Sequence, residues 1–220
     1  MMDRQDMTRL VIEKKIISIV RGVYGEECLT LADVLYEAGV RLIEVAYDHT
    51  DAQRFSLTND TIRLLSRTYG GRMLVGAGTV TSVDLVEAAH DAGASFIVSP
   101  DTRVDVIRKT RELQMLSMPG ALTPTEIGLA YDSGGDFIKV FPAGALGTAY
   151  FSALRAPLRH IPLLAVGNIG PENAADFLKA GAAGLGIGSS LERKDLLQNG
   201  RLDLLLDNAK KICGIAGIGS

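Results

Sequence analysis

The sequence predicts an α/β protein, a single (β/α)8 TIM barrel that spans residues 1–220 and begins with a short N-terminal helix. A repeated unit carries this prediction: a helical pattern ends at a glycine, and a short apolar run follows at once. Eight such runs begin near residues 16, 41, 73, 95, 115, 137, 163 and 184. Their spacing of roughly 20 to 30 residues fits one strand and one helix. Eight parallel strands alternating with eight helices close most economically into a barrel, since a doubly wound open sheet usually has fewer strands and a clearer switch point.

The expected elements follow in order from the N-terminus. Residues 6–15 carry Leu10, Val11 and Ile12 among charges and predict a short amphipathic helix. The β-branched run 16–21 predicts the first strand. Further along, Thr123 and Glu126 flank a proline in a capping-box pattern that predicts a helix start. The glycines that end a helix directly before a strand, by supplying its left-handed last residue, are Gly39, Gly93, Gly134 and Gly181.

Composition and charge exclude several functional classes. A hydrophobic content of 47% with 22% charged residues is typical of a soluble globular protein. The net charge of −3, with no Lys/Arg cluster beside an apolar face, predicts neither a nucleic-acid partner nor binding to a membrane surface. Residues 1–7 are polar and acidic, unlike a signal peptide, and no apolar run approaches membrane-spanning length. We therefore expect a cytoplasmic protein.

Cysteine and histidine usage predicts neither a disulfide framework nor a metal site. Cys28 and Cys213 lie far apart and form no CxxC pair. His49, His90 and His160 do not stand at metal-ligand spacing. We expect no metal and no cofactor. Of the three, His49 alone lies near the expected mouth of the barrel, where it could contact the substrate.

One lysine stands in the middle of an apolar strand and is the leading candidate for chemistry. In the run 136–142, Phe137 and Lys139 point to one side and Ile138 to the other, so neither face is simply polar. Glu44 is likewise a charged residue within an apolar strand, the second one. Because reacting groups of barrels lie at the C-terminal ends of strands, the two charges are expected to share one lumen. They either form a buried ion pair that fills the barrel mouth, or provide a desolvated amine that attacks a carbonyl beside a carboxylate.

The glycine-rich ends of the last two strands allow two interpretations. Backbone N–H groups around Gly167 and residues 186–190 could form a concave anion site where barrels often hold phosphate. Alternatively, these positions are glycine because a helix packs closely on a strand. The GxG at residues 76–78 is more typical of a tight turn than of a ligand loop.

Taken together, these motifs resemble the bacterial 2-keto-3-deoxy-6-phosphogluconate (KDPG) aldolases, which also act as 4-hydroxy-2-oxoglutarate (KHG) aldolases. The resemblance runs from about Ile16 to Leu191. It rests on ordered motifs: Ile-Val-Arg-Gly at 19–22, Ile-Glu-Val at 43–45, Val-Gly-Ala-Gly-Thr-Val at 75–80, Phe-Ile-Val-Ser-Pro at 96–100, Met-Pro-Gly-Ala-Leu-Thr-Pro-Thr-Glu at 118–126, Lys-Val-Phe-Pro-Ala at 139–143 and Gly-Ile-Gly-Ser at 186–189.

The resemblance implies a homotrimer of (β/α)8 barrels and a metal-free lysine mechanism acting on a small 2-oxo acid that can be phosphorylated. Lys139 resembles the Schiff-base lysine, and Glu44 resembles the general acid/base. The products would be pyruvate and an aldehyde. On this basis Arg21 and Thr79 are expected to line the pyruvate half with Pro100 as a wall, and Gly167 and Ser189 to lie at the phosphate end. The other expected substrate-binding positions are Phe141, Val166, Asn168 and Gly188.

Several positions depart from the family pattern. Asp48 stands where the family often has an arginine that holds the substrate carboxylate, so Arg21 would have to bind that group with its planar fork. Gly144 replaces a common glutamate. Val166 and Asn168 replace the threonine and the second glycine of a Pro-Thr-Gly-Gly motif. These departures fall on substrate recognition and leave the lysine and its carboxylate in place.

Three hypotheses follow for the function. The first is a class I aldolase that cleaves a 2-keto-3-deoxy (phospho)sugar acid or a 4-hydroxy-2-oxo acid. The second is another phosphate-binding barrel, an isomerase or decarboxylase, that uses Lys139 as an acid. The third is a catalytically silent relative that binds a 2-oxo acid or a sugar phosphate.

Overall fold

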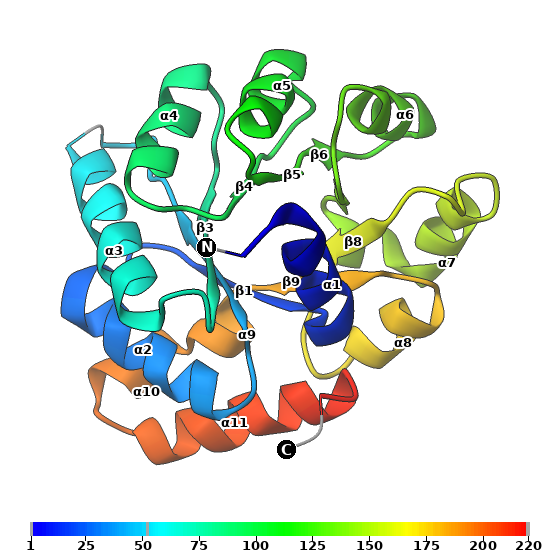
Figure 1. Cartoon of the computed structure of the whole chain (residues 1–220). Helices are drawn as coiled ribbons and strands as arrows, with labels where there is room; N and C mark the ends of the chain where they lie inside the picture. Colours follow the sequence, from blue (N-terminus) through cyan, green and yellow to red (C-terminus); the bar gives the residue numbers. More distant parts are fainter. Residues whose placement is uncertain (1, 52, 219–220) are drawn as a thin grey trace.

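The computed structural model describes residues 2–51 and 53–218, and it confirms the predicted barrel (Figure 1). Within these residues all strands are parallel and form one sheet in the order β5-β4-β3-β2-β1-β9-β8-β7-β6. The strands are β1 (Ile16–Val20), β2 (Leu42–Ala46), β3 (Leu74–Gly78), β4 (Phe96–Val98), β5 (Leu116–Met118), β6 (Gly120–Ala121), β7 (Ile138–Val140), β8 (Leu163–Val166) and β9 (Gly184–Ile187).

The structure divides the expected fifth strand in two. Pro119 alone separates β5, which pairs with β4, from β6, which pairs with β7. Proline has no N–H to donate to a ladder, and here only its carbonyl is used, accepting from the Lys139 N–H at 2.9 Å. Because β5 and β6 are consecutive in the chain, the two ends of the sheet meet and the barrel closes. The other strands begin within one residue of the expected positions.

Helices surround the sheet. They are α2 (Gly25–Glu37), α3 (Arg54–Tyr69), α4 (Val83–Asp91), α5 (Val104–Glu112), α6 (Pro124–Asp132), α7 (Ala143–Arg155), α8 (Ala174–Lys179), α9 (Ser189–Glu192), α10 (Lys194–Gln198) and α11 (Leu202–Ile215). The capping box predicted for α6 is confirmed, with Thr123 accepting from the Glu126 N–H and Glu126 accepting from the Thr123 N–H. In the described part of the chain, no helix combines the length and apolar character needed to cross a membrane.

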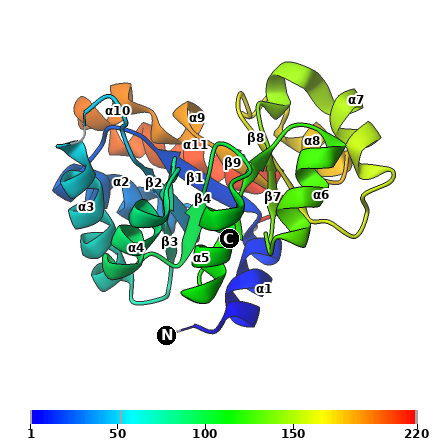
Figure 2. The same ribbon diagram turned by 90° about the horizontal axis from the view of Figure 1, so that it is seen from above.

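The N-terminal helix closes one end of the barrel. Helix α1 (Arg4–Lys14) buries Met7 and Val11 against the inward side chains of the strands, among them Leu42 and Phe137. Figure 1 shows α1 in the middle of the ring of helices, and Figure 2 shows it on one side of the sheet. Since α1 packs on the N-terminal end of the lumen, the C-terminal ends of the strands are the side left for a ligand site.

The period-two pattern of the strands is confirmed by the two apolar clusters. Ile138 and Val140 belong to the cluster between strands and helices, whereas Phe137 belongs to the cluster inside the barrel. Leu42 likewise points inward, and Ile43 outward. This alternation places both charged strand residues on the lumen side.

Candidate active site

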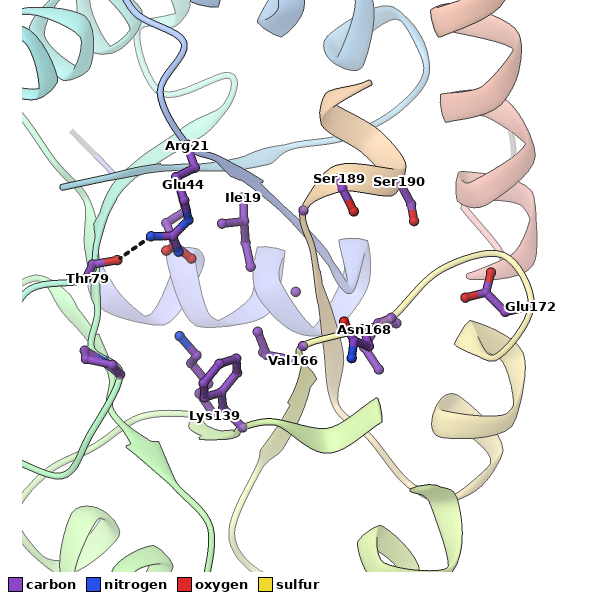
Figure 3. A pocket seen from close by; sticks show the side chains of 16 residues that line it. Ile19, Arg21, Glu44, Thr79, Lys139, Val166, Asn168, Glu172, Ser189 and Ser190 are labelled. Carbon is purple, nitrogen blue, oxygen red and sulfur yellow. Dashed lines mark hydrogen bonds between the residues drawn. The ribbon is translucent and has the colours of Figure 1, made fainter. Parts of the chain in front are cut away.

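A cavity of about 630 Å³ opens at the C-terminal end of the barrel. All eleven residues that we predicted from the sequence to be catalytic or substrate-binding line this cavity. They are Arg21, Glu44, Thr79, Pro100, Lys139, Phe141, Val166, Gly167, Asn168, Gly188 and Ser189. Figure 3 shows these groups at two ends of the cavity, with Arg21, Glu44, Thr79 and Lys139 at one end and Asn168, Glu172, Ser189 and Ser190 at the other.

Lys139 lies in the lumen with 7% of its surface exposed. Strand β7 fixes its backbone between β6 and β8, and its Nζ lies 5.1 Å from the ring centroid of Phe141. Burial lowers the pKa of the Lys139 ammonium, and the positive charge of Arg21 lowers it further, while Glu44 partly opposes both effects. A larger fraction of this amine is therefore uncharged at neutral pH than of a surface lysine, and an uncharged amine is nucleophilic.

Glu44 faces the same lumen from strand β2 and is 2% exposed. Burial raises the pKa of its carboxyl group, against the opposing effects of Lys139 and Arg21. The space for this side chain comes from Gly78 on the neighbouring strand β3, because a Cβ there would lie 1.8 Å from Glu44 Oε1. A carboxyl group that holds its proton more tightly than usual can donate that proton to a leaving hydroxyl and take it back.

Arg21 brings a cation to the rim above this pair. It is the first residue after β1, and its Nη1 donates to Thr79 Oγ1 at 3.4 Å (Figure 3). Thr79 has a left-handed backbone, with φ of +58°, at the end of β3. His49 does not line the cavity; its Nε2 lies 2.8 Å from the Thr79 carbonyl oxygen and supports that turn from behind.

The opposite end of the cavity includes several glycines and residues with left-handed backbones. Gly167 and Asn168 both have left-handed backbones, with φ of +92° and +54°. A Cβ on Gly186 would lie 2.8 Å from Val166, so close packing explains that glycine. At Gly188 the nearest atom would lie 3.9 Å away, so packing does not explain that one. Val166 lies on the neighbouring strand β8, so the crowding at Gly186 comes from a strand and not from the helix packing that the sequence suggested, while the anion site around Gly188 stays a prediction.

Three further residues line the cavity that the sequence did not single out: Ile19, Ile169 and Glu172. Strand alternation from Ile17, which points into the barrel, could have identified Ile19. Glu172 lies in the loop after β8, two residues before α8 begins at Ala174. Its carboxylate is the one acidic group at this end of the cavity among the lining residues.

Asp48 does not bring a negative charge into the cavity. Its carboxylate accepts from Arg54 Nη1 at 2.8 Å and from the Thr50 hydroxyl at 2.6 Å, and both interactions lie outside the lining residues. These bonds lower the pKa of Asp48, with those from Thr50 as the largest cause. The position that carries an arginine in the family pattern is thus used here to hold the loop after β2.

The described residues contain no cluster of three or more His, Cys, Asp or Glu arranged to hold a metal ion. Cys28 and Cys213 are both buried free thiols. Among the lining residues of the cavity, Lys139 supplies the one amine, and Glu44 supplies the carboxyl group at the same end (Figure 3).

A parallel barrel with a desolvated amine and a carboxyl group at the C-terminal end of its lumen is the architecture of an aldolase that works through a Schiff base. The chain belongs to the KDPG and KHG aldolase family, whose sequence model matches residues 7–207. It is accordingly a class I aldolase, a carbon–carbon lyase.

Individual relatives agree with this family. The 2-dehydro-3-deoxy-6-phosphogalactonate aldolase of Escherichia coli (strain K12) is 35% identical over 179 residues, covering 81% of this chain and 84% of the relative. A 2-dehydro-3-deoxy-phosphogluconate aldolase of Haemophilus influenzae is 30% identical over 201 residues, covering 89% of this chain and 92% of the relative. A solved structure described as "Native KDPGal structure" superposes with a TM-score of 0.82 at 32% identity, covering 91% of this chain and 93% of that one.

Proposed function

We propose that this aldolase cleaves a 2-keto-3-deoxy-6-phospho sugar acid to pyruvate and a phosphorylated aldehyde, with Lys139 as the nucleophile. The observation that carries the proposal is the position of Lys139, whose buried amine faces Glu44 and Arg21 in a cavity at the C-terminal end of the barrel. A 2-oxo acid entering that cavity meets an amine, a proton donor and a cation at the same end.

The first half of the reaction forms the Schiff base. Uncharged Lys139 Nζ attacks the C2 ketone and gives a carbinolamine. Glu44 donates a proton to the C2 hydroxyl, which leaves as water, so an iminium forms and Glu44 becomes a carboxylate. The raised pKa of Glu44 and the lowered pKa of Lys139 both favour this starting state.

The second half breaks the carbon–carbon bond. Glu44 takes the proton of the C4 hydroxyl, the C3–C4 bond breaks, and its electron pair moves onto C3 and the iminium to give an enamine. The aldehyde leaves. Protonation at C3 and attack of water at C2 then release pyruvate and return the free amine. The protein needs to supply only proton transfers and a fixed geometry for these steps.

The two ends of the cavity fit the two ends of such a substrate. Arg21, Thr79 and the apolar walls Pro100 and Phe141 surround the place for the 2-oxo carboxylate, where a guanidinium can bind both oxygens. The backbone groups around Val166, Gly167, Asn168, Gly188 and Ser189 face the far end, which we assign to the phosphate. The names of the phosphogalactonate and phosphogluconate aldolases above support a phosphorylated substrate.

The test begins with pyruvate alone. The protein is incubated with pyruvate and borohydride, digested, and searched by mass spectrometry for the reduced adduct. We expect the adduct on Lys139 and none in Lys139→Met, with the exposed Lys179 as an internal control. A folded protein without an adduct on Lys139 would contradict the assignment, and it would favour the silent relative or a barrel that uses the lysine as an acid.

The substrate class needs a second measurement. A panel of 2-keto-3-deoxy acids with and without a terminal phosphate is assayed for pyruvate release by a coupled lactate dehydrogenase. We expect the phosphorylated acids to have the higher kcat/KM. A clear preference for acids without phosphate would reject the phosphate assignment and leave the lysine mechanism intact.

The assembly and the location belong to the same proposal. We propose a homotrimer, which is supported by the family resemblance and by exposed apolar side chains on consecutive helices, Leu129 and Tyr131 on α6 and Leu146 on α7. Light scattering should give three times the 23.4 kDa mass of the chain. We also place the enzyme in the cytoplasm, which imaging of a tagged chain would test.

A further inference from the structure

Both backbone polar groups of Arg21 are held by one short segment that is distant in the sequence. Strand β1 ends at Val20, so Arg21 makes no ladder bonds of its own. Its N–H donates to Glu192 Oε1 at 2.7 Å, and its carbonyl accepts from Lys194 Nζ. The two side chains also face each other, with Lys194 Nζ 3.7 Å from Glu192 Oε1. The backbone of Arg21 is thus held both at its N–H and at its carbonyl oxygen.

Glu192 is buried in a place where an apolar residue would be expected. It lies at the end of α9, which packs on β1, and only 7% of it is exposed, while the neighbouring Leu191 belongs to the apolar core. Burying a carboxylate is costly unless it is paired and hydrogen-bonded. Its partners here are the Arg21 N–H and Lys194. The contacts of Glu192 therefore converge on one residue of the active-site rim.

We propose that Glu192 and Lys194, hereafter the clamp, position the guanidinium of Arg21 for the substrate carboxylate. Neither clamp residue lines the cavity, so both act through Arg21 and are positioning residues. The proposal rests on the proposed role of Arg21. It also gives α9 a double task, because its first residues, Ser189 and Ser190, line the far end of the cavity while its last residue holds the near end.

The clamp makes a specific prediction about binding and turnover. A long side chain on an unfixed backbone loses more freedom when it binds, so loosening Arg21 weakens pyruvate binding. The chemistry on Lys139 and Glu44 is untouched, because neither contacts the clamp through any hydrogen bond found in the described residues. A defect in binding with an unchanged rate at saturation is therefore the signature.

The experiment uses the full-length enzyme with pyruvate as the probe. Apparent Kd comes from the pyruvate dependence of borohydride trapping on Lys139. The rate at saturation comes from exchange of the pyruvate C3 protons with deuterated water, followed by NMR. The variants are Glu192→Met, which removes the acceptor, and Glu192→Gln, which keeps an acceptor oxygen, each alone and with Arg21→Gln. The matched control is Asp195→Asn, an exposed acid in the same segment whose partner is Arg193.

We expect Arg21→Gln to raise the Kd by at least about 30-fold and Glu192→Met by about 10-fold, with Glu192→Gln and Asp195→Asn within about threefold of the parent. The saturated exchange rate of Glu192→Met should stay within about twofold. In the Arg21→Gln background, Glu192→Met should add nothing, because its effect passes through the missing guanidinium.

Other results would overturn the clamp. An unchanged Kd in Glu192→Met, or a loss that adds fully to that of Arg21→Gln, rejects it while the role of Arg21 stands. An unchanged Kd in Arg21→Gln rejects the proposed role of Arg21 and the clamp with it. If Glu192→Met fails to fold, Lys194→Met carries the same test, with about a threefold rise in Kd alone and none beside Arg21→Gln; an unchanged Kd there rejects the clamp.

Discussion

Replacing Gly78 by alanine should disable Glu44 without disturbing the barrel. The new Cβ would lie 1.8 Å from Glu44 Oε1 and 2.5 Å from its Cδ, whereas ordinary contact begins at 3.4 Å. The carboxyl group must therefore retreat by about 1.6 Å, and its side chain can do so because it borders the cavity. Since a misplacement of about 1 Å can cost about 100-fold in rate, we expect kcat to fall by at least about 100-fold.

The assay for Gly78→Ala is exchange of the pyruvate C3 protons in deuterated water, which needs no knowledge of the aldehyde. Borohydride trapping is run in parallel, and it should still yield the Lys139 adduct after longer incubation, because the amine is not displaced. Gly128→Ala is the matched control, since a Cβ at this glycine of α6 meets nothing within 4 Å. That control should keep the parental rate and gain about 0.5–1 kcal/mol of stability from the better helix residue.

The reasoning about Gly78 fails if Gly78→Ala keeps the parental melting temperature and exchanges pyruvate protons within about threefold of the parental rate. Glu44 would then not act from the position that the structure gives it. A variant that loses both its fold and its activity would contradict the expectation that the side chain, rather than the strand, gives way.

The other predictions concern charge, stability and the far end of the cavity. Arg21 lowers the pKa of Lys139 and Glu44 raises it. The rise of Schiff-base formation with pH should therefore move to higher pH in Arg21→Gln and to lower pH in Glu44→Gln. Stopped-flow trapping over a pH series checks both signs, and shifts in the same direction would contradict them. Glu44→Gln should also slow turnover by at least about 100-fold while pyruvate binding is kept, and an unchanged rate would remove Glu44 from the mechanism. The double variant Lys139→Met, Glu44→Gln should be inactive yet about 1–4 kcal/mol more stable to denaturant, since two buried ionisable groups, which are costly to desolvate, give way to groups that cannot ionise; a destabilised double variant would contradict this. Gly144→Glu should raise KM for phosphorylated substrates and leave the Kd of pyruvate unchanged, because it displaces only the loop at residues 167–168.

The barrel could be predicted because each strand carries its own local signals. Glycine stops and apolar runs place most strand starts within one residue, and alternation orients Lys139 and Glu44 toward the lumen. The break at Pro119 was not predicted, since it depends on which neighbour each half pairs with. Local pattern determines where a strand begins, whereas pairing determines where it is interrupted.

The candidate site was predictable to the extent that its residues sit at strand ends. The fold brings those ends together, and all eleven expected residues line one cavity. The clamp could not be predicted, because Glu192 and Arg21 are 171 positions apart and no periodicity links them. The position of Asp48 could not be predicted either, since it depends on the hydrogen bond to Arg54 on the following helix, outside the lumen.

Two of the departures from the family pattern, Gly144 and Asn168, are structurally coupled, because their backbones are in contact. The Gly144 N–H donates to the Gly167 carbonyl at 2.9 Å. A Cβ at Gly144 would lie 2.4 Å from the backbone carbonyl oxygen of Asn168, so a glutamate fits there only if the loop after β8 moves away. Asn168 in turn takes a left-handed backbone that asparagine adopts more readily than most residues, and Asn173 Nδ2 donates to its carbonyl at 2.9 Å.

This coupling separates specificity from chemistry in the molecule. The loop after β8 and the start of α7 set the shape of the far end, and they can change together without touching strands β2 and β7, which carry Glu44 and Lys139. Strand residues held by ladder bonds on both sides stay in place when a loop moves, as the proton donor and the amine require. The identity of the aldehyde half can therefore differ from that of other family members while the bond-breaking steps remain the same.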